Sequence, residues 1–194
     1  MGDEPSLDAI GVALRVGAAI EAAGGAYFVG GSLASSLQGE PRATNDVDIV
    51  LQLPIGRIDR LVATLGADFE VDGDMLRDAL LHGRSCNVFY LATVMKVDLF
   101  AVGPGPFDES EFSRRRPVVV RGAETMVLKS PEDTVLRKLL WYREGGFVSE
   151  RQWRDVVEVL RVSGAGMDAE YLTGWAGRLK LSELLARARG EAAR

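Results

Sequence analysis

Three aspartates and a glycine turn are the residues of this 194-residue chain whose types and spacing could do chemistry together. The turn is Gly30-Gly31-Ser32, and fourteen residues after it comes Asp46, separated from Asp48 by one valine. Side chains alternate along a strand, so Asp46 and Asp48 share a face, and Asp98 can approach them if its strand is a neighbour. This grouping predicts a site for a divalent cation and a phosphorylated ligand.

Three carboxylates in one place need a compensating charge. Two unit charges about 4 Å apart repel by roughly 4 kcal/mol at an effective dielectric constant of 20. Magnesium prefers oxygen ligands and takes a few carboxylates together with substrate phosphates, which suits such a cluster. We therefore expect Asp46, Asp48 and Asp98 to bind Mg²⁺, with Mn²⁺ as the alternative ion, and Asp98 also to help deprotonate an acceptor hydroxyl.

The glycine turn would supply the phosphate-binding half of the site. Backbone amides at a helix N-terminus bind phosphate oxygens, and glycine permits the close approach, so Gly30, Gly31 and Ser32 are candidate nucleotide-binding residues. Metal-assisted attack on the α-phosphate of a nucleoside triphosphate, with pyrophosphate leaving, combines both halves. Taken singly, a Gly-Gly-Ser turn and an Asp-x-Asp strand edge are common, so their order along the chain carries the hypothesis.

Hydrophobic periodicity and turn residues predict the elements that must position these side chains. The first helix runs from Ser6, as its N-cap, to about Ala23. The elements expected next are a strand at 26–29, a helix at 32–37, a strand at 46–53, a helix at 56–65, a strand at 68–71, a helix at 74–81, a hairpin of strands at 87–92 and 95–102, and a strand at 117–120. The proline of the last strand favours a sheet edge.

After Ser130 the pattern becomes helical, with Ser130 as an N-cap and Pro131 at the tolerated first position. Helices are expected over 149–162, 171–179 and 181–188. We predict an α+β fold in which a small mixed β-sheet head flanked by helices, residues 1–129, is followed by a C-terminal helical bundle, residues 130–194.

Composition limits the classes of function. A hydrophobic content of 47% allows a sizeable core, and no apolar run is long enough to span a membrane, so we expect a cytoplasmic protein without membrane contact. One cysteine and one histidine exclude a Cys/His zinc site. A net charge of −5 disfavours a broad nucleic-acid surface. A local basic patch of Arg114, Arg115, Arg116 and Arg121 could still contact RNA, or be an ordinary solvated loop.

The glycine turn, the segment Arg42-x-Thr44-x-Asp46-Val47-Asp48-Ile49 and Asp98 together resemble the nucleotidyltransferase domain of the DNA polymerase beta superfamily. The resemblance covers roughly residues 26–102. It implies a small mixed sheet flanked by helices, two magnesium ions, and catalytic roles for the three aspartates. For Arg42 two interpretations remain open, a contact with the triphosphate or an ion pair with the neighbouring aspartates.

The C-terminal half is similar to the helical half of AbiEii-type toxin nucleotidyltransferases and related small bacterial proteins, through Ser130-Pro131-Glu132-Asp133, Lys138 and Arg154-Asp155. That resemblance implies that Lys138 and Asp155 bind the nucleotide, ATP or another triphosphate. Solvated charges on helix faces are the alternative interpretation of both residues.

Two functions follow as hypotheses. The first is a metal-dependent nucleotidyltransferase that moves a nucleoside monophosphate to a hydroxyl of an RNA or tRNA end, a protein or a small molecule, with the toxin of a toxin-antitoxin pair and an antitoxin partner as one setting. The second is a non-catalytic nucleotide-binding or partner-binding module of the same fold.

Overall fold

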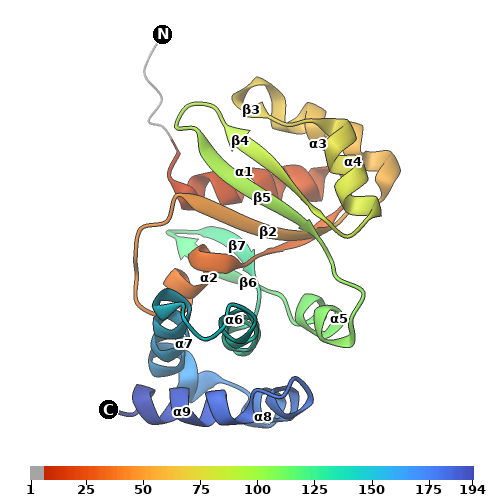
Figure 1. Ribbon diagram of the computed structural model, residues 1–194. Helices are drawn as coiled ribbons and strands as arrows, with labels where there is room; N and C mark the ends of the chain where they lie inside the picture. Colours follow the sequence, from red (N-terminus) through yellow and green to blue (C-terminus); the bar gives the residue numbers. More distant parts are fainter. Residues whose placement is uncertain (1–6) are drawn as a thin grey trace. The chain divides into compact units, whose positions relative to one another are not determined.

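The computed structural model describes residues 7–194, which form two compact units (Figure 1). The first unit holds the described residues up to Leu33 together with Thr44–Leu128, and the second holds Ala34–Ala43 together with Lys129–Arg194. The division into a head domain of residues 1–129 and a helical domain of residues 130–194 stays a prediction. None of the helices within 7–194 combines the length and apolar character needed to cross a membrane.

The first unit is built on a seven-stranded mixed sheet in the order β3-β4-β5-β2-β1-β7-β6. Its strands are β1 Ala26–Val29, β2 Asp46–Gln52, β3 Phe69–Glu70, β4 Ser85–Tyr90, β5 Met95–Ala101, β6 Arg116–Arg121 and β7 Glu124–Leu128. The β2–β5 and β1–β7 pairs are parallel and the other neighbours antiparallel. The predicted α+β class, the β4–β5 hairpin and the edge position of the Pro117 strand are confirmed.

Helices lie on both faces of this sheet. One face is covered by α1 Ala9–Ala22, α3 Ile58–Leu65 and α4 Gly73–Leu81, with short 3₁₀ turns η1 Ile55–Arg57 and η2 Gly66–Asp68. The helix α5 Pro106–Ser113 lies on the other face, where the ring of Phe112 contacts that of Phe28. The helix α1 lies behind β2 and β5 in Figure 1 and packs against β1, β2, β7 and α3. Its side chains Val16 and Ile20 are fully buried, as are Ile49 of β2 and Leu99 of β5. These residues form the core on which the strands are aligned.

The start of α1 differs from the prediction. The N-cap is Asp8, whose carboxylate accepts a hydrogen bond of 2.9 Å from the backbone N–H of Gly11. The predicted cap, Ser6, lies outside the described residues. Both are good capping types, and the apolar spacing alone does not choose between them.

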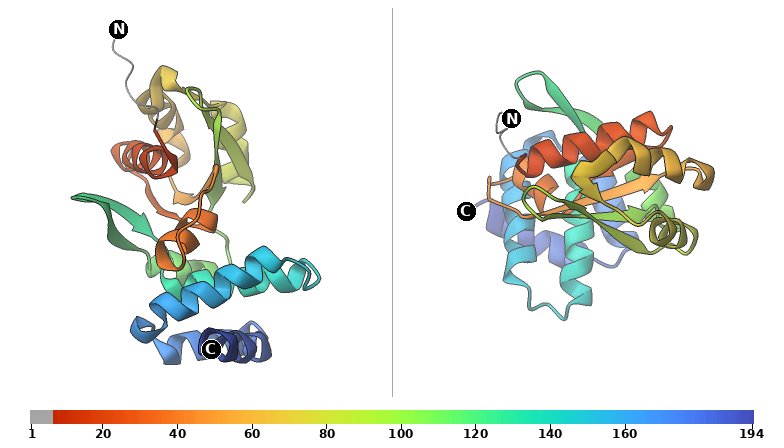
Figure 2. Two further views of the ribbon diagram at one scale, coloured as in Figure 1. Left: turned by 90° about the vertical axis from the view of Figure 1, so that its left-hand side faces the viewer. Right: turned by 90° about the horizontal axis from the view of Figure 1, so that it is seen from above.

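Two elements were missed from the sequence. The helix α5 begins at Pro106, in a stretch where the sequence analysis predicts no element, although proline is well suited to the first helical position. The strand β7 pairs with β6 across a turn at Gly122, and its residues Met126 and Leu128 are buried in alternation. Figure 2 shows β6 and β7 extending from the sheet as a two-stranded arm.

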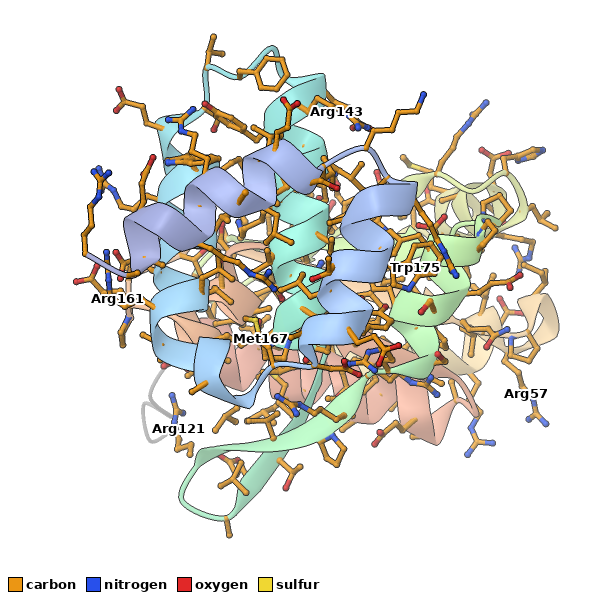
Figure 3. All side chains as sticks on the ribbon, turned by 90° about the horizontal axis from the view of Figure 1, so that it is seen from below. Arg57, Arg121, Arg143, Arg161, Met167 and Trp175 are labelled. Atoms are coloured by element: carbon orange, nitrogen blue, oxygen red, sulfur yellow. The ribbon has the colours of Figure 1, made fainter. Side chains whose placement is uncertain are left out.

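The second unit is helical, as predicted for the C-terminal part. It contains α6 Pro131–Glu144, α7 Glu150–Ser163, η3 Gly164–Gly166, α8 Ala169–Arg178 and α9 Ser182–Ala192. The helix α7 packs against α6 and α9, and α6 packs against α8, so that α8 and α9 lie across the α6–α7 pair (Figure 3). The predicted N-cap of α6 is confirmed, because Ser130 Oγ accepts from the N–H of Asp133 at 3.1 Å.

The helix α2 Gly31–Gln38 begins in the first unit and ends in the second. Its last residue, Gln38, is fixed to the helical unit at three points. The side-chain amide donates to the carbonyl of Lys129 at 2.7 Å, and it accepts from Thr134 Oγ1 at 2.6 Å. The backbone carbonyl of Gln38 accepts from Ser163 Oγ at 2.6 Å. The buried amide therefore has its donor and acceptor groups satisfied within this unit.

Candidate functional site

The predicted carboxylates lie on neighbouring parallel strands. On β2 the residues Val47, Ile49 and Leu51 are buried, whereas Asp46 is exposed and Asp48 half-buried, which confirms the predicted alternation. The β2–β5 register places Asp48 opposite Asp98. Side chains opposite one another on a parallel pair share a face, and adjacent strands are about 4.8 Å apart. The pairing thus brings the carboxylates onto one face of the sheet.

The glycine turn lies directly against the second carboxylate. The N–H of Gly30 donates to the backbone carbonyl of Asp48 at 2.8 Å, so the amide of Gly30 locks the turn onto β2. Gly31 opens α2 with a φ of +55°, and a Cβ at this position would lie 1.7 Å from Asp48 Oδ2. Ser32 follows as the second residue of α2 and is half-buried. Glycine at position 31 is therefore required both by its backbone conformation and by the carboxylate beside it.

A lysine that the sequence analysis did not assign joins this group. Lys96 Nζ lies 2.8 Å from Asp98 Oδ2, and the two side chains are 37% and 15% exposed. The hydrogen bond to Asp98 raises the pKa of the Lys96 ammonium, burial opposes that shift, and the negative charges of Asp98, Asp46 and Asp48 add to the rise. The signal in the sequence was present, because Lys96 and Asp98 are two residues apart on one strand and must share a face.

The donor chemistry of the group fits an oxygen-bound divalent cation. Carboxylates are hard oxygen ligands of the kind that Mg²⁺ takes. The negative charges of Asp98, Asp46 and Asp48 each act to raise the pKa of the Lys96 ammonium, so all three aspartates favour a positive charge beside them. Among residues 7–194, no three His, Cys, Asp or Glu side chains already converge as a ready-made metal cage.

The other predicted site residues, Arg42, Lys138 and Asp155, come together in the helical unit. The carboxylate of Asp155 on α7 is buried and accepts from Lys138 Nζ on α6 at 2.7 Å. It also accepts from Arg42 Nη2 at 2.8 Å and from Arg42 Nε at 3.1 Å, a bidentate contact. Ser35 Oγ and Gln152 Oε1 complete the network, at 3.2 Å from Asp155 Oδ2 and 3.0 Å from Lys138 Nζ.

The network shows which partners the three charges have within their unit. Arg42 pairs with Asp155 and not with the aspartates of β2, so the ion pair predicted with its neighbours is wrong in its partner, and the contact with the triphosphate stays a prediction. Lys138 and Asp155 are buried, so they are not solvated charges on a helix face. Two cations share one carboxylate, which leaves a net charge of +1 on this group.

Burial and ion pairing act on these groups in opposite directions. Burial alone would raise the pKa of Asp155, but hydrogen bonds from Arg42 and Lys138 and their positive charges outweigh it and lower the pKa below its usual value. Burial lowers the pKa of the Lys138 ammonium, and the hydrogen bond and charge of Asp155 oppose that shift in part. Asp155 is therefore held ionised as the shared counter-ion of two cations.

Of the arginines proposed to contact RNA, Arg114, Arg115 and Arg116 lie at the start of the β6–β7 arm, and Arg121 is the last residue of β6, before the turn at Gly122. Arg115 packs its guanidinium over the ring of Phe112, 4.1 Å from the centroid, and donates to the carbonyl of the same residue at 2.6 Å. Arg121 pairs with Asp8 at 2.5 Å. Arg114 is the C-cap of α5, and Arg116 is the exposed first residue of β6. At least two of the four thus make contacts inside the first unit.

Comparison with solved structures identifies the fold. A crystal structure of an antigenic nucleotidyltransferase-like protein from Paracoccidioides brasiliensis matches 95% of this chain and 93% of its own, with a TM-score of 0.60 and 17% identity. This chain has the fold of nucleotidyltransferase-like proteins. The solution structure of the antibiotic-resistance factor ANT(2'')-Ia matches 93% of this chain and 98% of its own, with a TM-score of 0.52 and 16% identity.

A crystal structure of ANT(2'')-Ia in complex with adenylyl-2''-tobramycin matches 86% of this chain and 93% of its own, with a TM-score of 0.50 and 15% identity. Comparisons of the sequence with protein-family models and with curated proteins give no significant match. The nucleotidyltransferase fold predicted from the resemblance is thus confirmed, whereas the closer similarity to AbiEii-type toxins stays a prediction.

The contact between Gly31 and Asp48 can be tested with a matched pair of glycines. Gly31 and Gly122 both have a φ of +55°, but a Cβ at Gly122 would meet no atom within 4 Å. We expect Gly122→Ala to lower the free energy of unfolding by about 1 kcal/mol, through the positive φ alone. Gly31→Ala should cost about 1 kcal/mol more, because the carboxylate of Asp48 must move.

Urea unfolding of both variants, in the wild-type and Asp48→Ala backgrounds, measures this difference. In the Asp48→Ala background the cost of Gly31→Ala should fall toward that of Gly122→Ala. Equal costs for the two glycines in the wild-type background would contradict the close contact.

The buried charge network predicts a stability effect. Asp155→Asn leaves two cations without their carboxylate, so we expect the free energy of unfolding to fall by about 3 kcal/mol. Removing Lys138 as well, in Lys138→Met/Asp155→Asn, should restore part of that loss, because the unpaired buried ammonium is gone. Denaturant unfolding of the two single variants and the double variant gives the coupling energy. Strictly additive losses would argue against the ion pair.

The lowered pKa of Asp155 predicts how the free energy of unfolding changes with pH. A carboxyl whose pKa is lowered by folding stabilises the native state above its unfolded pKa, about 3.9, and that contribution is lost as the pH falls through the native value. The wild-type protein should therefore lose more stability than Asp155→Asn between pH 5 and the acid range. Unfolding curves over a pH series test the sign, and a steeper acid loss in the variant would refute it.

Proposed function

We propose that the protein is a metal-dependent nucleotidyltransferase that moves a nucleoside monophosphate from a nucleoside triphosphate to a hydroxyl acceptor and releases pyrophosphate. The observation that carries the proposal is the parallel register that sets Asp48 opposite Asp98, with the Gly31 turn against the carboxylate of Asp48. The chain also shares its fold with a nucleotidyltransferase-like protein, which supports the proposal.

In this mechanism Asp46 and Asp48 would hold Mg²⁺ or Mn²⁺, and Asp98 would be the third ligand. A divalent cation bound there supplies charge stabilisation on the phosphates and a lower pKa for the attacking hydroxyl. Asp98 accepts the proton of the acceptor hydroxyl as its oxygen attacks the α-phosphorus, and the bond to the pyrophosphate oxygen breaks. The turn at Gly31 and Ser32 orients the phosphates through the N-terminus of α2, while Gly30 fixes the turn to β2.

The charge network of the helical unit supports a role in nucleotide binding. Arg42 and Lys138 share the single carboxylate of Asp155, so the group carries a surplus positive charge where triphosphates carry negative charge. A guanidinium and an ammonium are the usual protein partners of phosphate oxygens. We assign phosphate contacts to Arg42 and Lys138, and to Asp155 the positioning of both cations.

The acceptor class remains part of the proposal. ANT(2'')-Ia, one of the proteins of similar fold, has been crystallised with adenylyl-2''-tobramycin, a nucleotide joined to a small molecule. A hydroxyl of a small molecule, of an RNA or tRNA end, or of a protein fits the same chemistry. If the acceptor is an RNA or a protein, the enzyme could be the toxin of a toxin-antitoxin pair, with an antitoxin protein as its partner. For RNA, transfer should weaken steeply with salt through the basic patch of Arg114, Arg115, Arg116 and Arg121.

The decisive measurement is pyrophosphate release from each of the four nucleoside triphosphates with Mg²⁺ and a cell extract as acceptor. We expect Asp48→Asn to lower the rate at least about 100-fold, the loss of roughly 2.7 kcal/mol of transition-state stabilisation. Asp59→Asn is the matched control, because Asp59 is an exposed carboxylate of the same unit that pairs with Arg77.

Release that survives in Asp48→Asn would refute the assigned site. Magnesium-dependent triphosphate binding without release, in every extract, would instead support the non-catalytic module. Chromatography of the labelled product identifies the acceptor class when α-labelled triphosphate is used.

A further inference from the structure

Lys96 lies beside the three aspartates, where the proposed reaction needs a divalent metal ion. Lys96 is the register partner of Asp46 and lies two residues before Asp98 on β5, so its side chain emerges on the face that carries the carboxylates. Its ammonium is in hydrogen-bond contact with Asp98 at 2.8 Å. It is the only lysine of the first unit, because the other three, Lys129, Lys138 and Lys180, belong to the second unit.

We propose that Lys96 is the resident counter-ion of the carboxylate cluster, which holds Asp98 while no metal is bound and competes with the divalent cation for that carboxylate. The inference rests on the proposed function, since the competing cation is the metal of that reaction. An ammonium and a divalent cation on one carboxylate repel each other, so the lysine must release Asp98 before the third ligand becomes available. Lysine is suited to this exchange, because it is a hydrated point charge on a flexible stem.

The exposure of the pair is consistent with exchange rather than with a permanent bridge. Lys96 is 37% exposed, so its ammonium can turn into solvent, whereas the more buried Asp98, 15% exposed, stays on the sheet. The contrast with the helical unit is clear, because Lys138 and Asp155 there are 3% and 7% exposed and form a fixed pair. Lys96 therefore neutralises the metal-free cluster and raises the cation concentration needed to complete the site.

The test is Mn²⁺ binding to the nucleotide-free full-length protein, measured by titration calorimetry and by the loss of the free-ion electron paramagnetic resonance signal. Lys96→Met should bind Mn²⁺ about two- to fivefold more tightly than the wild type, the free energy of a partly exposed ion pair. Lys96→Arg, which keeps the charge, should stay near the wild-type affinity. Arg57→Met, which removes an exposed cation of η1 in the same unit, should change it by less than about twofold.

Competition for one particular carboxylate gives a second signature. In an Asp98→Asn background the effect of Lys96→Met on Mn²⁺ affinity should disappear, because the contested ligand is gone. The metal-free Lys96→Met protein should also unfold at a lower temperature than the wild type, and Mn²⁺ should raise its melting temperature by more.

The outcomes separate this inference from the proposed function. If Lys96→Met binds Mn²⁺ as the wild type does, or more weakly, the competition is refuted while the metal site stands. If the effect of Lys96→Met persists in Asp98→Asn, the lysine acts through general charge and the inference also fails. If neither the wild type nor Lys96→Met binds Mn²⁺, with or without triphosphate, the proposed function fails and the inference falls with it.

Discussion

The parallel pairing of β2 with β5 determines which side chains meet on the sheet, and the candidate site depends on it. The buried residues Val47, Ile49 and Leu99 fix the register from the core side. A slip by one residue would turn these apolar side chains to solvent and the acids Asp48 and Asp98 into the core, which would be costly in free energy. Burial of the apolar side chains thus brings the carboxylates of Asp48 and Asp98 together on the other face, where their like charges need a compensating cation.

The two units meet the problem of concentrated charge in different ways. On the sheet, acids outnumber cations and the cluster is open to solvent, so its charge balance can change when a ligand arrives. In the helical unit, the buried carboxylate of Asp155 is surrounded by donors from Arg42, Lys138 and Ser35. A buried carboxylate is tolerated only when its lone pairs are satisfied, so this arrangement is rigid.

Much of the secondary structure in both units could be predicted because its signals are local. The alternation around Asp46 and Asp48, the glycine turn before α2 and the cap at Ser130 each rest on a few consecutive residues. The strand β7 and helix α5 were missed because Pro106 and the short apolar stretch before Leu128 permit more than one structure, and tertiary packing decides.

Pairings between residues far apart in the chain could not be predicted from the sequence. The interaction of Arg42 with Asp155 joins residues 113 positions apart, and no spacing rule connects them. The neighbouring aspartates Asp46 and Asp48 offered Arg42 a nearer alternative along the chain. For Lys96 the alternation placed the ammonium on the correct face, but its choice of Asp98 depends on rotamers that sequence does not encode.

The path of the chain has a consequence for modularity. Residues 34–43 leave the sheet unit, join the helical unit and return before β2, so the polypeptide crosses the division three times. A fragment beginning at Lys129 would lack Ser35, Gln38 and Arg42, and with them the partners of Thr134 and Asp155. Residues 129–194 therefore cannot be transferred by recombination or cloning with their charge network intact. The network of Arg42, Lys138 and Asp155 is inherited only together with residues 34–43, which lead into β2.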